Sequence, residues 1–69
     1  MKNPLVSPEV AIDLGYQDGA DLRRRHGHQP GQLDTDILTH GARYAGLDLY
    51  GHWLKGFRAG HSGERKPIA

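Results

Sequence analysis

Five histidines stand out among the residues of this chain that could do chemistry, because histidine is a common ligand of transition metals. They are His26, His28, His40, His52 and His61. No two of them show the i, i+4 spacing of a helical two-histidine site, and the chain has no cysteine to complete a zinc site. We therefore expect no metal and no other cofactor, and we assign these histidines to solvated or helix-capping positions.

The groups that could support catalysis are also sparse. The carboxylates of Asp13, Asp18 and Asp21 lie in a segment that has ordinary helical reasons to carry them, and Ser7 and Ser62 have no base at a suitable spacing. The glycines match neither the dinucleotide-binding fingerprint nor the P-loop. A chain of 69 residues is also short for building a pocket that excludes water. The sequence therefore predicts a protein that is not an enzyme.

Cations and aromatic rings offer a different chemistry, the binding of nucleic acid. The run "RRRHGHQ" begins with Arg23, Arg24 and Arg25, which could contact phosphates, while Tyr44, Tyr50 or Trp53 could stack on bases. A structural alternative exists, because three cations at the C-terminal end of a helix complement its dipole without any partner. Nine Lys and Arg against eight Asp and Glu leave a net charge of +1, which does not by itself require a nucleic-acid partner. The pattern alone favours the structural alternative.

The segment "WLKGFRAG" (53–60) contains the only tryptophan and the only phenylalanine of the chain. Trp53 and Phe57 are one helical turn apart, which indicates a core or interface stripe. Lys55 and Arg58 fall off that stripe, on the solvent side of the expected helix. Protein interfaces favour tryptophan, tyrosine and arginine. A protein partner that contacts Tyr50 and Trp53 therefore remains open beside RNA binding.

Two helices must position these side chains, and the first is well marked. "SPEV" is a typical helix start with Ser7 as the N-cap and a proline at the first helical position. Cations close the segment, and Gly27 follows them where a C-cap is expected. The sequence therefore predicts a helix over residues 8–26, with Gly15 and Gly19 among its apolar positions.

A second helical period covers residues 35–60, with Asp34 or Thr35 as its expected cap. The apolar positions of this period are Leu38, Ala42, Ala45, Leu49, Trp53 and Phe57. Glycines interrupt the segment at five-residue spacing, and each weakens a helix. We therefore expect a break near residues 45–48, with Asp48 capping a third, short helix.

The resulting fold class is all-α: a small two-helix hairpin whose second helix is broken into two. We expect an N-terminal arm over residues 1–7, a single helical domain over 8–61 and a disordered tail over 62–69. Close approach of the helices at Gly15 and Gly19, with Trp53 or Phe57 covering them, would hold the hairpin together. The expected ion pairs across an antiparallel hairpin join Arg23–Arg25 to Asp34 and Asp36, and Lys55 and Arg58 to Glu9 and Asp13.

Two further expectations concern association and location. Two short helices bury little apolar surface, so we expect self-association into a homo-oligomer such as a dimer. The segment "MKNPLVSPEV" lacks the apolar run of a signal peptide, and no stretch of the chain is long and apolar enough to span a membrane. We therefore expect a soluble, cytoplasmic protein without a membrane partner.

Two blocks of the chain resemble the ribosome modulation factor family of small bacterial proteins. "GYQDGADL" (15–22) is similar to a first-helix block with a Gly-Tyr-x-x-Gly pattern, and "WLKGFRAG" (53–60) is similar to a second block, Trp-Leu-x-Gly-aromatic-Arg. Family members are two-helix proteins that bind the small ribosomal subunit, block messenger engagement and promote ribosome dimers. The matched positions are Gly15, Tyr16, Gly19, Trp53, Gly56 and Arg58.

The resemblance implies a non-enzymatic regulator of translation that binds the ribosome and its rRNA. The residues expected to contact phosphates are Arg23, Arg24, Arg25, Lys55 and Arg58, and Tyr16 or Trp53 would contact bases or protein. The alternative is a small inhibitor or adaptor, of the sort that phages and mobile elements encode, which covers the surface of a host protein.

Overall fold

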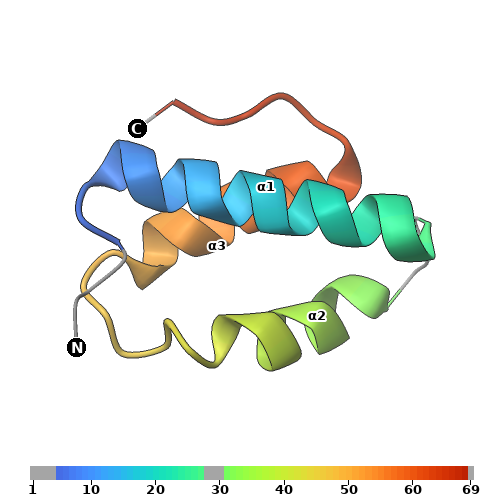
Figure 1. The fold of residues 1–69 in the computed structure, drawn as a ribbon, viewed down its shortest axis with the longest axis horizontal. Helices are drawn as coiled ribbons and strands as arrows, with labels where there is room; N and C mark the ends of the chain where they lie inside the picture. Colours follow the sequence, from blue (N-terminus) through green and yellow to red (C-terminus); the bar gives the residue numbers. More distant parts are fainter. Residues whose placement is uncertain (1–4, 28–30, 69) are drawn as a thin grey trace.

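The computed structural model describes residues 5–27 and 31–68 of the chain. Three helices make up the fold: α1 (Pro8–His26), α2 (Gln32–Gly41) and α3 (Tyr50–Ser62) (Figure 1). No strand occurs in these two described ranges. The prediction of an all-α protein whose second helical segment is broken is therefore confirmed.

The ends of α1 are those that the sequence predicts. The backbone N–H of Val10 donates to the hydroxyl of Ser7 at 3.2 Å, which caps the first turn. At the other end, Gly27 takes a positive φ of 72°, and its N–H donates to the carbonyl of Arg23. Both contacts satisfy backbone groups that a helix end leaves without intrahelical partners.

The expected caps of the second and third helices are wrong. Helix α2 begins at Gln32 after Gly31, which has a φ of 84°, and no side chain caps it. Asp34 therefore lies inside the first turn of α2. Leu49 precedes α3, and no side-chain cap bond forms there, so Asp48 does not cap the third helix.

Helix α3 runs parallel to α1, which corrects the antiparallel packing expected for a hairpin. Gly15 lies against the backbone at Trp53, and Gly19, one turn later, lies against the backbone at Phe57 and His61. The chain runs along α1, returns along α2 and then reverses again before α3 (Figure 1). The second reversal occurs in the turns between Gly41 and Tyr50, which include Gly46 with a φ of 90°.

The early positions of the expected apolar stripe are exposed. Leu38 is 78% exposed, and Ala42 and Ala45 are also exposed, because the helix ends at Gly41 and the period does not continue through the turn. Leu33 and Ile37 of α2 pack against the core instead.

Aromatic rings form the centre of the core. Trp53 and Phe57 are fully buried, with ring centroids 4.7 Å apart. The ring of Tyr44 also lies against the indole of Trp53, tilted by 43° with ring centroids 5.2 Å apart. Leu5 is buried in the same core, so the expected N-terminal arm contributes to it, while residues 1–4 lie outside the described ranges.

Residues 64–68, here called the C-terminal strap, lie along α1 (Figure 1). The hydroxyl of Tyr16 donates to the carbonyl of Glu64 at 2.6 Å, and Lys66 forms an ion pair with Asp13 at 2.5 Å. A disordered tail was expected over 62–69, whereas Ser62 belongs to α3 and the strap is held by α1. Residue 69 falls outside the described ranges.

None of the three helices in the described part of the chain is both long enough and apolar enough to cross a membrane.

Candidate functional site

Four glycines at the contact between α1 and α3 determine which face of α3 packs against α1 and which face points away. A Cβ atom added to Gly15 would overlap the carbonyl oxygen of Trp53, and one added to Gly19 would overlap that of Phe57. The same relation holds in the other direction, because Gly56 faces the carbonyl of Ile12. Gly60 faces the carbonyl of Tyr16 in the same way. The predicted close approach at Gly15 and Gly19 is confirmed, and we call this glycine-lined contact the α1–α3 seam.

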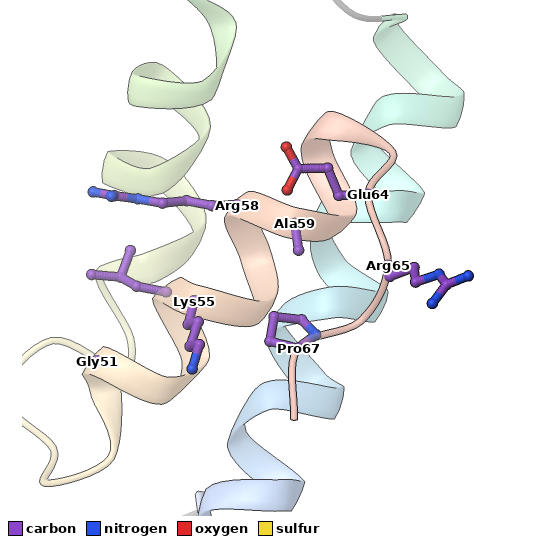
Figure 2. A pocket seen from close by; sticks show the side chains of 8 residues that line it. Gly51, Lys55, Arg58, Ala59, Glu64, Arg65 and Pro67 are labelled. Carbon is purple, nitrogen blue, oxygen red and sulfur yellow. The ribbon is translucent and has the colours of Figure 1, made fainter. Parts of the chain in front are cut away.

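The seam leaves one face of α3 turned away from α1, and the strap forms a wall beside it. Together they enclose an open groove of about 490 Å³ (Figure 2). The residues that line the groove are Gly51, Leu54, Lys55, Arg58 and Ala59 of α3, and Glu64, Arg65 and Pro67 of the strap. Lys55 and Arg58, two of the residues that the sequence nominated, both line the groove.

The charge of the groove is predominantly positive. Lys55, Arg58 and Arg65 are exposed, and none of the ion pairs found within residues 5–27 and 31–68 involves them. Glu64 is the one acidic residue in the lining. Figure 2 shows that the three cationic side chains diverge: Lys55 and Arg58 extend from α3, and Arg65 points outward from the strap. Diverging cations suit an extended anion with several charges better than a single small ion.

The arginines at the end of α1 are divided between two duties. Arg24 and Arg25 each form an ion pair with Asp21 at 3.2 Å, and their side chains are 74% and 68% exposed. Arg23 turns toward α3, donates to the carbonyl of His61 at 3.3 Å and covers Gly63. Arg23 thus serves the end of α3, and the other two share a neighbouring carboxylate.

The aromatic residues nominated for stacking are engaged within the fold. Trp53 is fully buried, and its indole N–H donates to the carboxylate of Asp18 at 3.2 Å. Its assignment to a surface contact is therefore corrected: the ring belongs to the core. Tyr50 is half-buried and stacks on Trp53 with ring centroids 5.9 Å apart. The hydroxyl of Tyr16 holds the strap.

A buried polar pair joins α2 to α3. His61 Nε2 lies 2.9 Å from Oδ2 of Asp36, the side chains being 1% and 6% exposed, so the expectation of a solvated His61 is wrong. The amide of Gln32 donates to Oδ1 of the same carboxylate at 2.9 Å, while His61 Nδ1 has no hydrogen-bond partner among the described residues. Burial raises the pKa of Asp36, but the hydrogen bonds of Gln32 and His61 and the charges of His61 and His26 outweigh it and hold that pKa below its usual value.

The buried His61–Asp36 pair has a structural role, because neither side chain is accessible to a molecule in solution. With 1% of its side chain exposed, His61 does not reach a substrate in solution. Across the described ranges, which do not include His28, no three His, Asp or Glu side chains come together in a way that could hold a metal ion.

Arg65 is the cation of the groove lining that the sequence did not nominate. It lies in the segment expected to be disordered, and its position depends on contacts with residues about fifty positions away in the chain, such as Lys66 with Asp13. The available signal was the accumulation of cations late in the sequence, from Lys55 to Lys66. That signal indicates charge but not position.

Comparison of the chain with protein-family models, with curated protein sequences and with solved structures finds no match in any of the three. The groove and the residues that build it are therefore the basis for inferring a function.

Proposed function

We propose that this protein is a small, non-enzymatic regulator of translation that binds RNA phosphates through the groove between α3 and the strap. The observation that carries the proposal is the presence of three exposed cations, Lys55, Arg58 and Arg65, that form no ion pair within the described residues. Cationic contacts with phosphates supply most of the affinity of sequence-independent RNA binding. Cations without an internal partner are available for such contacts.

The form of the groove supports a polymer rather than a small substrate. It is open along its length, and its cations diverge instead of converging on one point (Figure 2). Small-molecule sites are concave and bury most of their ligand. A phosphate backbone needs only a series of cations along a surface.

The nature of the RNA target comes from the sequence. The blocks at 15–22 and 53–60 resemble those of the ribosome modulation factor family, and this resemblance supports ribosomal RNA in the cytoplasm as the target. Within the second block, Arg58 is a matched position, and its side chain is exposed in the groove. The glycines of both blocks have a packing duty at the seam, which holds this face of α3 outward.

Two double variants test the proposal, since each removes two positive charges from a different place. Lys55→Ala with Arg58→Ala changes the groove, and Arg24→Ala with Arg25→Ala changes the pairs with Asp21. Fluorescence anisotropy with a labelled single-stranded oligouridylate, measured over a salt series, gives the affinity and its salt dependence. The slope of log K against log salt is negative. For the groove variant we expect it to become shallower by about 1.4, since each lost contact with single-stranded RNA removes about 0.7 from its magnitude.

The α1 variant is the matched control, and its slope should change less because Asp21 already neutralises part of that charge. Equal loss in both variants would indicate a response to net charge alone and contradict the groove as the site. Binding that does not change with salt would contradict phosphate recognition.

Apolar side chains exposed on and just after α2 favour a second candidate, an inhibitor or adaptor that binds a host protein. Leu38 on α2 is 78% exposed, with Ala42 and Ala45 exposed beyond the end of the same helix. An apolar interface of this kind would be insensitive to salt and to ribonuclease. A pull-down from bacterial lysate, with and without ribonuclease, separates the candidates, because recovery of a single ribonuclease-insensitive protein contradicts the ribosomal proposal.

Self-association stays a prediction. Its premise was an apolar face left open by two short helices, and within a single chain Trp53 and Phe57 are both covered. Sedimentation velocity at micromolar concentration measures it directly, and a stable monomer would contradict it.

A further inference from the structure

We infer that Tyr16 is a positioning residue for the groove: its hydroxyl anchors the strap and thereby holds Arg65 in place for a polyanion. This inference rests on the proposed function, in which the groove binds RNA phosphates. It gives Tyr16 a part in binding without contact between its ring and the RNA.

The end of α3 and the strap that follows it are attached to α1 at successive points. The guanidinium of Arg23 donates to the carbonyl of His61 at the end of α3, and the hydroxyl of Tyr16 donates to the carbonyl of Glu64. Lys66 then pairs with Asp13. Residue numbers fall along α1 as they rise along the chain after α3, so the strap runs back antiparallel to α1, as Figure 1 shows.

Arg65 lies between two anchored residues, Glu64 and Lys66. The strap has no regular secondary structure, so these contacts decide where the Arg65 side chain is presented. The ion pair at Lys66 joins side chains that are 53% and 46% exposed, and exposed pairs of this kind hold weakly. The hydroxyl of Tyr16 instead donates to a backbone carbonyl, that of Glu64, at 2.6 Å, so it holds the main chain of the strap directly and does not depend on the rotamer of a second side chain.

Tyr16 is itself well fixed. Its carbonyl faces Gly60 across the seam, and its neighbour Gly15 is closed against Trp53. Because the backbone of Tyr16 is held in place, its hydroxyl group attaches the strap at a fixed position on α1. Because side chains and loops that are ordered in advance lose less entropy on binding, an anchored Arg65 should bind phosphate more tightly than one on a free strap.

Replacement of Tyr16 by Phe separates positioning from contact between the ring and a base, which the family resemblance implies for this residue. Tyr16→Phe retains the aromatic ring and removes the hydroxyl that donates to Glu64. If the ring stacks on a base, the variant should bind RNA as the wild type does. If the hydroxyl positions Arg65, the variant should bind more weakly.

The experiment measures binding of labelled oligouridylate to wild type, Tyr16→Phe, Arg65→Ala and the double variant. We expect Arg65→Ala to lose roughly fivefold in affinity, the equivalent of one net hydrogen bond. Tyr16→Phe should lose roughly twofold to fivefold by the same measure, and it should add little to the loss in Arg65→Ala because both act on one contact. Losses that multiply in the double variant, or a Tyr16→Phe variant equal to wild type, would overturn the inference.

A second measurement without RNA keeps this outcome distinct from failure of the proposed function. Limited trypsin digestion should cleave after Arg65 faster in Tyr16→Phe than in wild type, with cleavage after Lys55 in α3 unchanged. Tyr44→Phe, which removes a hydroxyl from the core instead, is the control and should match wild type. No binding of oligouridylate by the wild type overturns both proposals, whereas wild-type binding with an unchanged Arg65 cleavage rate in Tyr16→Phe overturns the anchor alone.

Discussion

Helix α3 packs against α1 and against α2 in opposite ways. At the α1–α3 seam, glycines on both helices let backbone meet backbone, and there is no room for even a methyl group at Gly15 or Gly56. Against α2, the contact is made by side chains, chiefly the His61–Asp36 pair and the apolar residues Leu33 and Ile37. The first contact depends on the absence of side chains, and the second depends on their identity.

This difference sets what each contact tolerates. A backbone carbonyl cannot move out of the way of a new atom without distorting its helix. An added side chain at the seam must therefore distort a helix or push the two helices apart. A side-chain contact can repack or open to water, so α2 should respond locally to change. Substitutions that separate the two contacts therefore test the comparison.

The largest effect is expected from Gly15→Ala. The new methyl group would overlap the carbonyl oxygen of Trp53, which forces α1 and α3 apart. We expect a loss of about 2–4 kcal/mol in the free energy of unfolding, the cost of overpacking less the modest gain in helix propensity. Urea denaturation followed by circular dichroism at the helix band measures the change.

Gly51→Ala is the matched control for this prediction. It makes the same substitution in a helix, but nothing lies within contact of the added carbon. Its stability should stay equal or rise by up to about 1 kcal/mol, since alanine favours helix over glycine. Equal losses in the two variants would show that the seam is no tighter than an exposed helix face.

A smaller effect is expected from Asp36→Ala. The substitution leaves His61 buried without its carboxylate, and an unsatisfied buried polar group costs about 1–3 kcal/mol. Hydrogen exchange should show faster exchange in α2 than in wild type, with α1 and the half of α3 at the seam still protected. Uniform loss of protection over all three helices would contradict the separation of the two contacts.

Acidification tests the same contact through Asp36→Asn. The pKa of Asp36 in the folded protein lies below the ordinary value of 3.8, so the unfolded chain binds this proton more readily. The stabilisation is complete above 3.8 and is lost as the pH falls below it, through the folded pKa. Wild type should therefore lose more stability than Asp36→Asn over this acidic range, and parallel curves for the two proteins would contradict the assignment.

The smallest effect is expected from Leu38→Gln. A helical stripe in the sequence placed Leu38 in line with Trp53 and Phe57, yet in the structure it is 78% exposed. Exposed substitutions away from special features usually change stability by less than about 0.5 kcal/mol. A loss above about 2 kcal/mol in a urea titration would restore Leu38 to the core, since burying a leucine is worth about that amount.

The sequence was most informative about features that a few neighbouring residues determine, such as the ends of a helix. Ser7 and Gly27 mark the ends of α1 by local chemistry, and the glycine spacing at Gly15 and Gly19 indicates a close approach. The break before α3 was also predicted, because glycines accumulate there. Each of these signals lies within a few residues of the feature that it specifies.

The direction of α3 was not predictable in the same way. The helical period from Leu38 to Phe57 continues through the turn as a pattern of letters, although the chain reverses there. The partner of His61 lies 25 residues away, and Tyr16 and Glu64 are 48 apart. Only the folded arrangement brings such residues together, so the pair and the strap wall of the groove had no local signal.

The parallel order of α1 and α3 has a consequence for how the chain acquires its structure. The two helices are not neighbours in sequence, so the intervening segment must loop back before any of the seam can form. Closing that loop costs entropy before the contacts reward it, and folding slows as contacts become less local. During synthesis α1 emerges before α3, so the glycine face of α1 has no partner until α3 has been made. The protein should therefore fold as one late event that follows completion of α3, more slowly than a helical chain of this size whose sequential helices pack together.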